Sequence, residues 1–258
     1  MTPILVFDVE TVPDVAGIRK LFDLPADLPD HDVAEIAFQK RRTQSGSDFL
    51  PVHLQRVIVI SCVLRHDEEV RVFSIGEPEV PEGAAIQRFF DGINKYVPQL
   101  VTWNGRGFDV PVLVSRGLIH GVAAACFWDT GADNKEFRYS NYISRFHDRH
   151  LDLMDLLSLY GAARSSPLDD LARLSGFPGK LGVGGAAVWD SYRAGQIASI
   201  RDYCEADVAN TYLLYLRFQM MRCALTPERY AEECALLRGV LEKRAEPHWG
   251  RFLSLWKS

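Results

Sequence analysis

The sequence predicts an α/β fold in which α-helices flank one mixed β-sheet. The first observation is an N-terminal strand, Pro3–Val9, that is apolar until Asp8, as a strand buried on both faces would be. The second is a pair of apolar stretches, 54–64 and 69–75, that HDEE joins as a hairpin. The third is that helical spacing alternates with a further short strand after this hairpin, an order typical of one α/β domain.

Each later element follows from its local pattern. Apolar residues recur at helical spacing over 84–96, and a short buried strand is expected at 99–103. Segment 126–147 is polar and aromatic without a clear period, so we expect an irregular excursion there. Further helices are expected at 109–116, 151–160, 168–175, 196–222 and from Thr226 to 243. Ser166 and Pro167 are expected to be the N-cap and the first residue of the helix at 168–175. The stretch 177–185 is expected to be a glycine-rich loop.

Composition limits the classes of function. The chain has 258 residues, of which 47% are hydrophobic and 24% charged, as in ordinary globular proteins with a sizeable core. We expect one domain over 1–258, with a core at about 1–222 and a helical extension at about 226–258. The formal net charge of -5 argues against non-specific duplex binding through a broad basic surface.

The cysteines and the N-terminus indicate a compartment. The five cysteines include no C-x-x-C pair, so neither a disulfide framework nor a zinc site is expected. The N-terminus lacks the basic flank and long apolar run of a signal peptide, and no apolar run reaches the roughly 18 residues of a membrane span. We therefore expect a cytoplasmic protein in a reducing environment, without membrane association.

An acidic pair follows the first apolar run. Asp8 and Glu10 are two apart on the expected strand, so both side chains project from the same face. Acids at the end of a buried strand are costly unless they bind something. The pair could hold a cation, or it could be a solvated turn at the strand end.

Two other stretches carry acids that are ambiguous when taken alone. Asp109 follows NGRGF, whose glycines would let the backbone approach a ligand, but an aspartate is also a favoured helix N-cap. Tyr203 and Asp207 are four apart on an expected helix and face the same way. The carboxylate could hold a metal while the phenol orients a water, although such pairs are common by chance.

Together these residues suit phosphodiester hydrolysis. The reaction needs an attacking hydroxide, charge relief at phosphorus and a stabilised leaving oxygen, which two hard cations roughly 4 Å apart supply. Magnesium and manganese prefer oxygen ligands, above all carboxylates. The chain offers four carboxylates and one phenol for such a site, from Asp8, Glu10, Asp109, Asp207 and Tyr203.

In these stretches the chain resembles the DEDD superfamily of 3′–5′ exonucleases, in its tyrosine-containing subclass. It is most similar to the predicted bacterial exonucleases related to the proofreading domain of family-B DNA polymerases. No catalytic position of the pattern is substituted, and the motifs span residues 8–207. The motifs are FDVET with Asp8 and Glu10, NGRGFD with Asn104, Phe108 and Asp109, and YCEAD with Tyr203 and Asp207.

The resemblance implies an RNase H-like fold, two divalent cations, Mg²⁺ or Mn²⁺, and hydrolysis from the 3′ end that releases nucleoside 5′-monophosphates. In that scheme Asp8 bridges both cations, and Glu10 and Asp207 hold the one that activates water. Tyr203 positions this water. Asp109 supports the second cation, largely through its water shell.

Several residues near the motifs are candidates for substrate contacts. Asn104 could bond the substrate or brace its loop. Phe108, Trp103 and Tyr139 could stack the terminal base, although Trp103 and Phe108 also fit the core. Lys180 lies in the glycine-rich stretch, where it could contact a phosphate or belong to a flexible surface loop.

Two further features leave alternatives open. Asp152, in the expected helix 151–160, could face the metals as a fifth acid or belong to a solvated helix face. Segment 28–47 is polar and irregular, and we expect a short helix followed by a mobile loop. Its basic cluster, 40–42, could guide a nucleic-acid strand over the active site or form a solvated helix end.

The sequence therefore predicts a 3′–5′ exonuclease that acts on single-stranded ends, DNA in preference to RNA. One alternative is a 3′–5′ exoribonuclease, because other DEDD enzymes trim RNA. Another is a catalytically silent nucleic-acid-binding subunit on the same fold. The intact set of four acids and the tyrosine speaks against the silent subunit.

Overall fold

A computed structural model describes residues 2–182 and 187–257 of the chain. In these residues a five-stranded mixed sheet has the order β3-β2-β1-β4-β5. Strand β1 pairs antiparallel with β2 and β2 with β3, whereas β4 and β5 run parallel to β1. The strands are β1 (Ile4–Pro13), β2 (Gln55–His66), β3 (Glu69–Gly76), β4 (Gln99–Thr102) and β5 (His150–Asp152).

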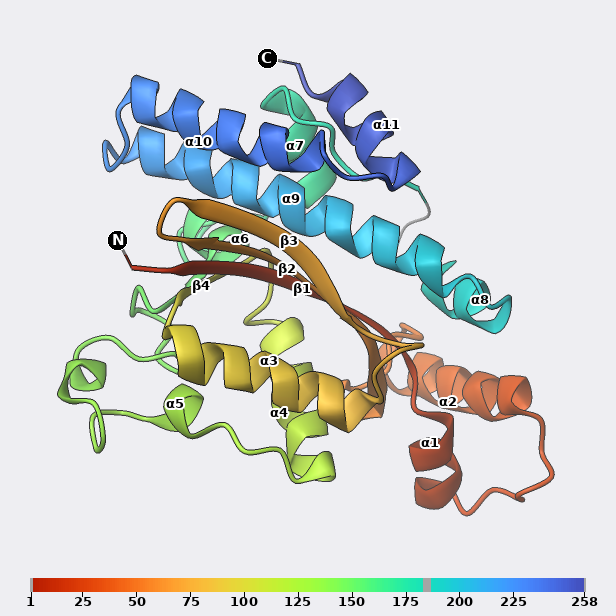
Figure 1. Ribbon diagram of the computed structural model, residues 1–258. Helices are drawn as coiled ribbons and strands as arrows, with labels where there is room; N and C mark the ends of the chain where they lie inside the picture. Colours follow the sequence, from red (N-terminus) through yellow and green to blue (C-terminus); the bar gives the residue numbers. More distant parts are fainter. Residues whose placement is uncertain (1, 183–186, 258) are drawn as a thin grey trace.

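Helices cover both faces of the sheet (Figure 1). Helices α3 (Glu82–Tyr96) and α4 (Asp109–His120) lie on one face, and α7 (Leu168–Leu174), α9 (Ile197–Met221), α10 (Pro227–Leu241) and α11 (Pro247–Leu255) lie on the other. The remaining helices are α1 (Val15–Leu21), α2 (Asp30–Ser45), η1 (Val52–Leu54), α5 (Ala125–Trp128), η2 (Lys135–Arg138), α6 (Leu153–Leu157) and α8 (Val188–Arg193). This arrangement confirms the predicted RNase H-like mixed sheet flanked by helices.

The central strand β1 explains how the two cores are separated. Successive side chains of a strand point to opposite faces, and β1 is apolar at every position from Ile4 to Phe7. Ile4 and Val6 belong to a buried cluster that includes α9, whereas Leu5 and Phe7 belong to a second cluster with α3. Because both faces are covered, Asp8 is carried into the middle of the molecule.

Some expected elements differ from the observed ones. The expected helix 151–160 is wrong at its start, because His150–Asp152 forms β5 on β4 and only Leu153–Leu157 is helical. The expected loop around 40–42 is also wrong, because α2 continues to Ser45. The buried side chains of Val33, Ala34 and Ala37 lie at helical spacing and give α2 an apolar face.

The helix ends show a similar mixture of outcomes. Thr226 caps α10 by accepting the N–H of Arg229, as expected, and Pro227 follows as its first residue. In contrast, Pro167 rather than Ser166 is the N-cap of α7. Gly184 and Gly185 of the expected glycine-rich loop lie outside the described residues. Within the described ranges, no helix is both long enough and apolar enough to cross a membrane.

Asp152 anchors the loop between β4 and α4. Its carboxylate is 4% exposed and accepts four backbone N–H groups. Two of them, from Met154 and Asp155, open α6, so Asp152 is a helix N-cap. The other two belong to Asn104 and Arg106, at 3.0 and 2.9 Å. Asp152 thus belongs neither to a solvated helix face nor to a free acidic site.

Replacing Asp152 by alanine is expected to lower the free energy of unfolding by about 3 kcal/mol. The helix cap accounts for about 1 kcal/mol, and the two loop N–H groups left without an acceptor account for about 1 kcal/mol each. Urea denaturation checks this value. The control is Thr226→Ala, which removes only a cap and is expected to cost about 1 kcal/mol. Equal losses in the two variants would contradict the anchoring role.

Candidate active site at the end of the first strand

Three atoms of the kinds that bind metals lie close together near Glu10 of β1. Oxygen atoms of Asp8 and Glu10 and the sulfur of Cys204 lie within 4.8 Å of one another. The sheet register of β1 on β2 shifts directly after Glu10, between Glu10 and Thr11. Cys204 lies on α9, and its thiol is 3.7 Å from Asp8 Oδ2. The strand and the helix that crosses it therefore share one polar spot inside an apolar core.

The start of α4 brings in the next acid. Asp109 is the first residue of this helix and is 3% exposed. Its Oδ1 accepts the backbone N–H of Val9 at 3.0 Å. The N-cap of α4 is Phe108, so Asp109 does not serve as that cap. This hydrogen bond fastens the second motif to the strand residue between the two acids of the first.

Helix α9 supplies the third motif from the opposite face. Tyr203 and Asp207 lie one turn apart and are 6% and 4% exposed. The ammonium of Lys180 joins them, 2.9 Å from Asp207 Oδ2 and 2.5 Å from the Tyr203 hydroxyl. Oδ1 of Asp207, in contrast, is buried without a hydrogen-bond partner among the residues that the structure describes.

Burial disfavours the ionised form of all four carboxyl groups, and repulsion from the neighbouring acids adds to this effect at Asp8 and Glu10. Burial raises the pKa of Asp8 well above its usual range, and the three other carboxylates raise it further. Burial and the Asp207 charge raise the pKa of Glu10. Burial raises the pKa of Asp109 to about 7, although the Val9 N–H opposes this shift. Burial raises the pKa of Asp207 too, against the attraction of Lys180.

Lys180 and Tyr203 keep their protons in this setting. Burial works against the charged form of Lys180, but the Asp207 carboxylate outweighs it and the pKa of Lys180 is raised. Burial raises the pKa of Tyr203, and the Asp207 charge adds to the rise. The site therefore holds a phenol that can donate a hydrogen bond and an ammonium that can meet an anion.

The residues fit hard divalent cations. The donor set is four carboxylates, which magnesium and manganese prefer. Oδ1 of Asp207 is a buried acceptor that a cation would satisfy. Burial and the Asp8 charge raise the pKa of the Cys204 thiol well above its usual range, so this group stays a thiol rather than a thiolate ligand.

The loop that carries Lys180 is held by residues that the sequence prediction did not single out. Asn210, fully buried on α9, bonds both the N–H and the C=O of Gly179. Asp169 accepts the N–H of Lys180 at 2.8 Å. Gly179 has φ +74, and a Cβ there would lie 2.4 Å from Asp169. Asn210 lies two turns after Tyr203 on the same helix face, so helical spacing could have indicated it.

The proposed substrate-contacting residues are divided between this site and other places. Asn104 is exposed, with φ +66, in the loop that Asp152 holds, and Phe108 follows in the same loop. The Phe108 ring packs on Phe49, which the sequence did not indicate. Trp103 packs against the core cluster that includes α9. Tyr139 is 83% exposed at the end of η2, in the excursion before β5.

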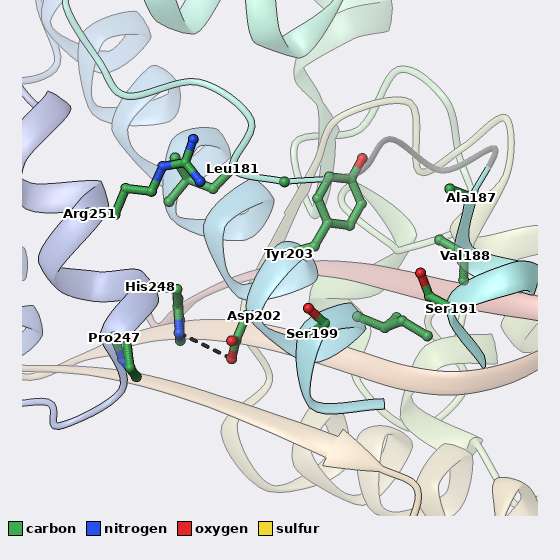
Figure 2. A pocket seen from close by; sticks show the side chains of 12 residues that line it. Leu181, Ala187, Val188, Ser191, Ser199, Asp202, Tyr203, Pro247, His248 and Arg251 are labelled. Atoms are coloured by element: carbon green, nitrogen blue, oxygen red, sulfur yellow. Dashed lines mark ion pairs between the residues drawn. The ribbon is translucent and has the colours of Figure 1, made fainter. Parts of the chain in front are cut away.

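A cavity of about 260 Å³ borders Tyr203 on the side of the C-terminal helix (Figure 2). His248 of α11 fixes one wall, because its Nδ1 lies 3.1 Å from Asp202 and its Nε2 lies 3.2 Å from Glu205. Arg251, one turn further on α11, also lines the cavity. Helix α11 thus docks on α9 within one residue of the candidate catalytic tyrosine.

Comparison with solved structures finds similar folds inside longer proteins. The family B DNA polymerase of the archaeon Pyrobaculum calidifontis aligns with 86% of this chain and 25% of its own, at 16% identity and a TM-score of 0.53. E. coli exonuclease I in complex with a dA16 oligonucleotide aligns with 90% of this chain and 43% of its own, at 14% identity and a TM-score of 0.39. The chain thus spans less than half of either protein.

The family comparison covers most of the sequence. No curated protein matches the chain. The family described as "Predicted 3'-5' exonuclease related to the exonuclease domain of PolB" matches residues 47–256. The match includes the second and third motifs, with Asp109, Tyr203 and Asp207, and begins after Asp8 and Glu10. The chain therefore belongs to this family of DEDD-type 3′–5′ exonucleases.

Proposed function

We propose that this chain is a metal-dependent 3′–5′ exonuclease of the tyrosine-containing subclass. It acts on single-stranded ends, DNA in preference to RNA, and releases nucleoside 5′-monophosphates. The relation of its family to the exonuclease domain of PolB supports DNA as the substrate. The carrying observation is that carboxylates of β1, α4 and α9 converge in one cluster, where burial raises all four pKa values and the neighbouring acids raise those of Asp8 and Glu10 further.

The four acids would hold two divalent cations, Mg²⁺ or Mn²⁺. The other three carboxylates all raise the pKa of Asp8, and we assign Asp8 to both cations. Glu10 and Asp207 are assigned to the cation beside Tyr203, and Asp109 supports the other. Bound cations would relieve charge at phosphorus and lower the pKa of the attacking water.

Tyr203 and Lys180 act on the water and the phosphate. The phenol of Tyr203 stays protonated, so it can hold and orient the attacking water through a hydrogen bond. Lys180 already lies beside this phenol, and its charge can meet a non-bridging phosphate oxygen. Asn104 and Phe108, presented by the loop that Asp152 holds, are assigned to the terminal nucleotide.

We also propose that 1–258 acts as a single exonuclease domain, with the core at about 1–222 and the extension at about 226–258. Two observations support it. Trp249 and Phe252 of α11 are fully buried in the same cluster as Tyr212 of α9. In addition, Arg65 of β2 makes a bidentate ion pair with Glu233 of α10, at 2.8 and 2.9 Å.

The first test concerns metal dependence. A 5′-labelled single-stranded oligodeoxynucleotide is expected to shorten to mononucleotides in Mn²⁺ and to stay intact in EDTA. Asp8→Asn is expected to slow this reaction at least about 100-fold, because one ligand of both cations is lost. Mn²⁺ is also expected to raise the thermal midpoint of the native protein, because it binds only the folded site.

The matched control for Asp8→Asn is Asp148→Asn, at an exposed acid outside the site. It should leave both the rate and the Mn²⁺-induced rise in thermal midpoint unchanged. In EDTA, Asp8→Asn should be at least as stable as the native protein, because one of four repelling carboxylates is gone. Full activity of Asp8→Asn would refute the assigned site, and faster cleavage of a matched RNA would refute the DNA preference.

The second test concerns the phenol. Tyr203→Phe is expected to lower the single-turnover rate about 100-fold and to leave oligonucleotide affinity unchanged, because the lost hydroxyl contacts the attacking water and Lys180 rather than the substrate. Gel shift in EDTA and single-turnover hydrolysis in Mn²⁺ separate the two effects. Tyr230→Phe on α10, whose phenol accepts from Arg217, serves as control. A loss confined to affinity would assign Tyr203 to substrate binding.

A further inference from the structure

A groove of about 360 Å³ opens beside the catalytic cluster. It lies between α2, the segment that follows it and α8, and both helices lie near the Pro13 end of β1 (Figure 1). Thr11, which directly follows Glu10, forms part of its lining. On another side the groove is lined by Phe49, whose ring centroid is 5.2 Å from that of Phe108. The groove therefore adjoins both the first and the second motif.

Aromatic side chains share the lining of this groove with charged ones. Phe49 is 59% exposed although it has a neighbouring aromatic ring, so a large apolar surface stays open to solvent. Phe38 of α2 and Trp189 of α8 line the same space. Open aromatic rings next to a nuclease site are typical of proteins that stack the bases of single strands.

The charges of the groove do not suit a phosphate group. The guanidinium of Arg42 pairs with Glu35 and lies 3.4 Å from Asp48. Its positive charge is therefore already balanced, and Asp190 adds a further acid to the lining. This pairing argues against the strand-guiding role of Arg42 that the basic cluster 40–42 suggested. An uncharged, flat group fits the groove better than an anion.

The neutral amide of Gln55 lines the groove beside Thr11. The buried side chain of Gln55 takes a hydrogen bond from the Thr11 hydroxyl at 2.9 Å and donates one to Leu50 O at 3.1 Å. An amide of this kind offers both a donor and an acceptor. Because Gln55 is neutral and bonded within the protein, it adds no charge to this side of the groove and does not select one base by charge.

We propose that this groove binds a nucleobase of the substrate strand, stacked on Phe49 and against Trp189, next to the cleaved nucleotide. The proposal rests on the proposed function and extends it to residues outside the three motifs. Stacking accepts every base, so the groove gives affinity without sequence selection. The backbone of the same nucleotide stays outside, beside the catalytic acids.

Binding without hydrolysis tests the proposal. Fluorescence anisotropy of a 3′-terminal single strand is measured in EDTA, with the native protein, Phe49→Ala and Phe49→Tyr. Phe49→Ala is expected to bind about 10-fold more weakly, and Phe49→Tyr to bind as the native protein does, since it keeps a stacking ring. Phe146→Ala, at a ring 71% exposed on a different segment, is the control and should bind normally.

Oligonucleotides with one abasic site locate the base. Placed at successive positions from the 3′ end, the abasic site should weaken native binding at one position. At that position Phe49→Ala should bind the abasic strand no more weakly than the native protein does, because the base that Phe49 would stack is absent. Equal abasic losses in both proteins at every position would overturn the proposal, as would normal binding by Phe49→Ala.

The same proteins separate this proposal from the proposed function. If the abasic effect depends on Phe49 but the native protein leaves DNA intact in Mn²⁺, the groove proposal holds and the proposed exonuclease activity is refuted. If the native protein degrades DNA but Phe49→Ala binds the strand normally, the proposed exonuclease activity holds and the groove proposal is refuted. Circular dichroism confirms that each variant is folded, and Phe49 is exposed enough for its removal to leave the core intact.

Discussion

The crowding of four carboxyl groups at one place, three of them buried and that of Asp8 partly exposed, is the constraint on which the rest of the structure depends. Burial alone disfavours each charge, and Asp8 feels the other three as well. Such a cluster is stable only where protons or cations balance it. Lys180 supplies one positive charge, paired with Asp207. The cations that we propose would balance the remaining negative charge, so the repulsion that destabilises the empty cluster would also favour the binding of metal.

The surrounding structure restricts where these acids can go. The Val9 N–H holds Asp109 against the strand, and the rigid core around α9 fixes Tyr203 and Asp207. The loops that carry the proposed substrate-contacting residues are held by buried polar residues, Asp152 for the second motif and Asn210 for the Lys180 loop. Preorganised acids lose little freedom when a substrate arrives, which favours catalysis over flexible capture.

Periodicity predicts β1 and its acidic pair well, because an unbroken apolar run fits a strand buried on both faces and two acids at its end need a balancing charge. It does not predict that Asp109 and Asp207 join the pair; only the motif resemblance does so. Strand β5 is beyond local prediction, because three residues are too few to show a period and its order comes from pairing with β4. The role of Asp152 is hidden for a similar reason, since two of its partners lie 48 and 46 residues earlier in the chain. The groove at Phe49 carries no motif at all.

The distance in sequence between the site residues has a consequence for folding. The contact between Val9 and Asp109 closes 100 residues of chain, and that between Asp8 and Cys204 closes 196. Contacts of such separation form late, after the local helices and the β2–β3 hairpin. A growing chain that has not yet delivered α9 lacks Tyr203 and Asp207 and so has only part of the candidate site. The candidate site is therefore complete only in a chain whose helix α9 has docked on the sheet, and under the proposed function a form without this contact would not cut nucleic acid.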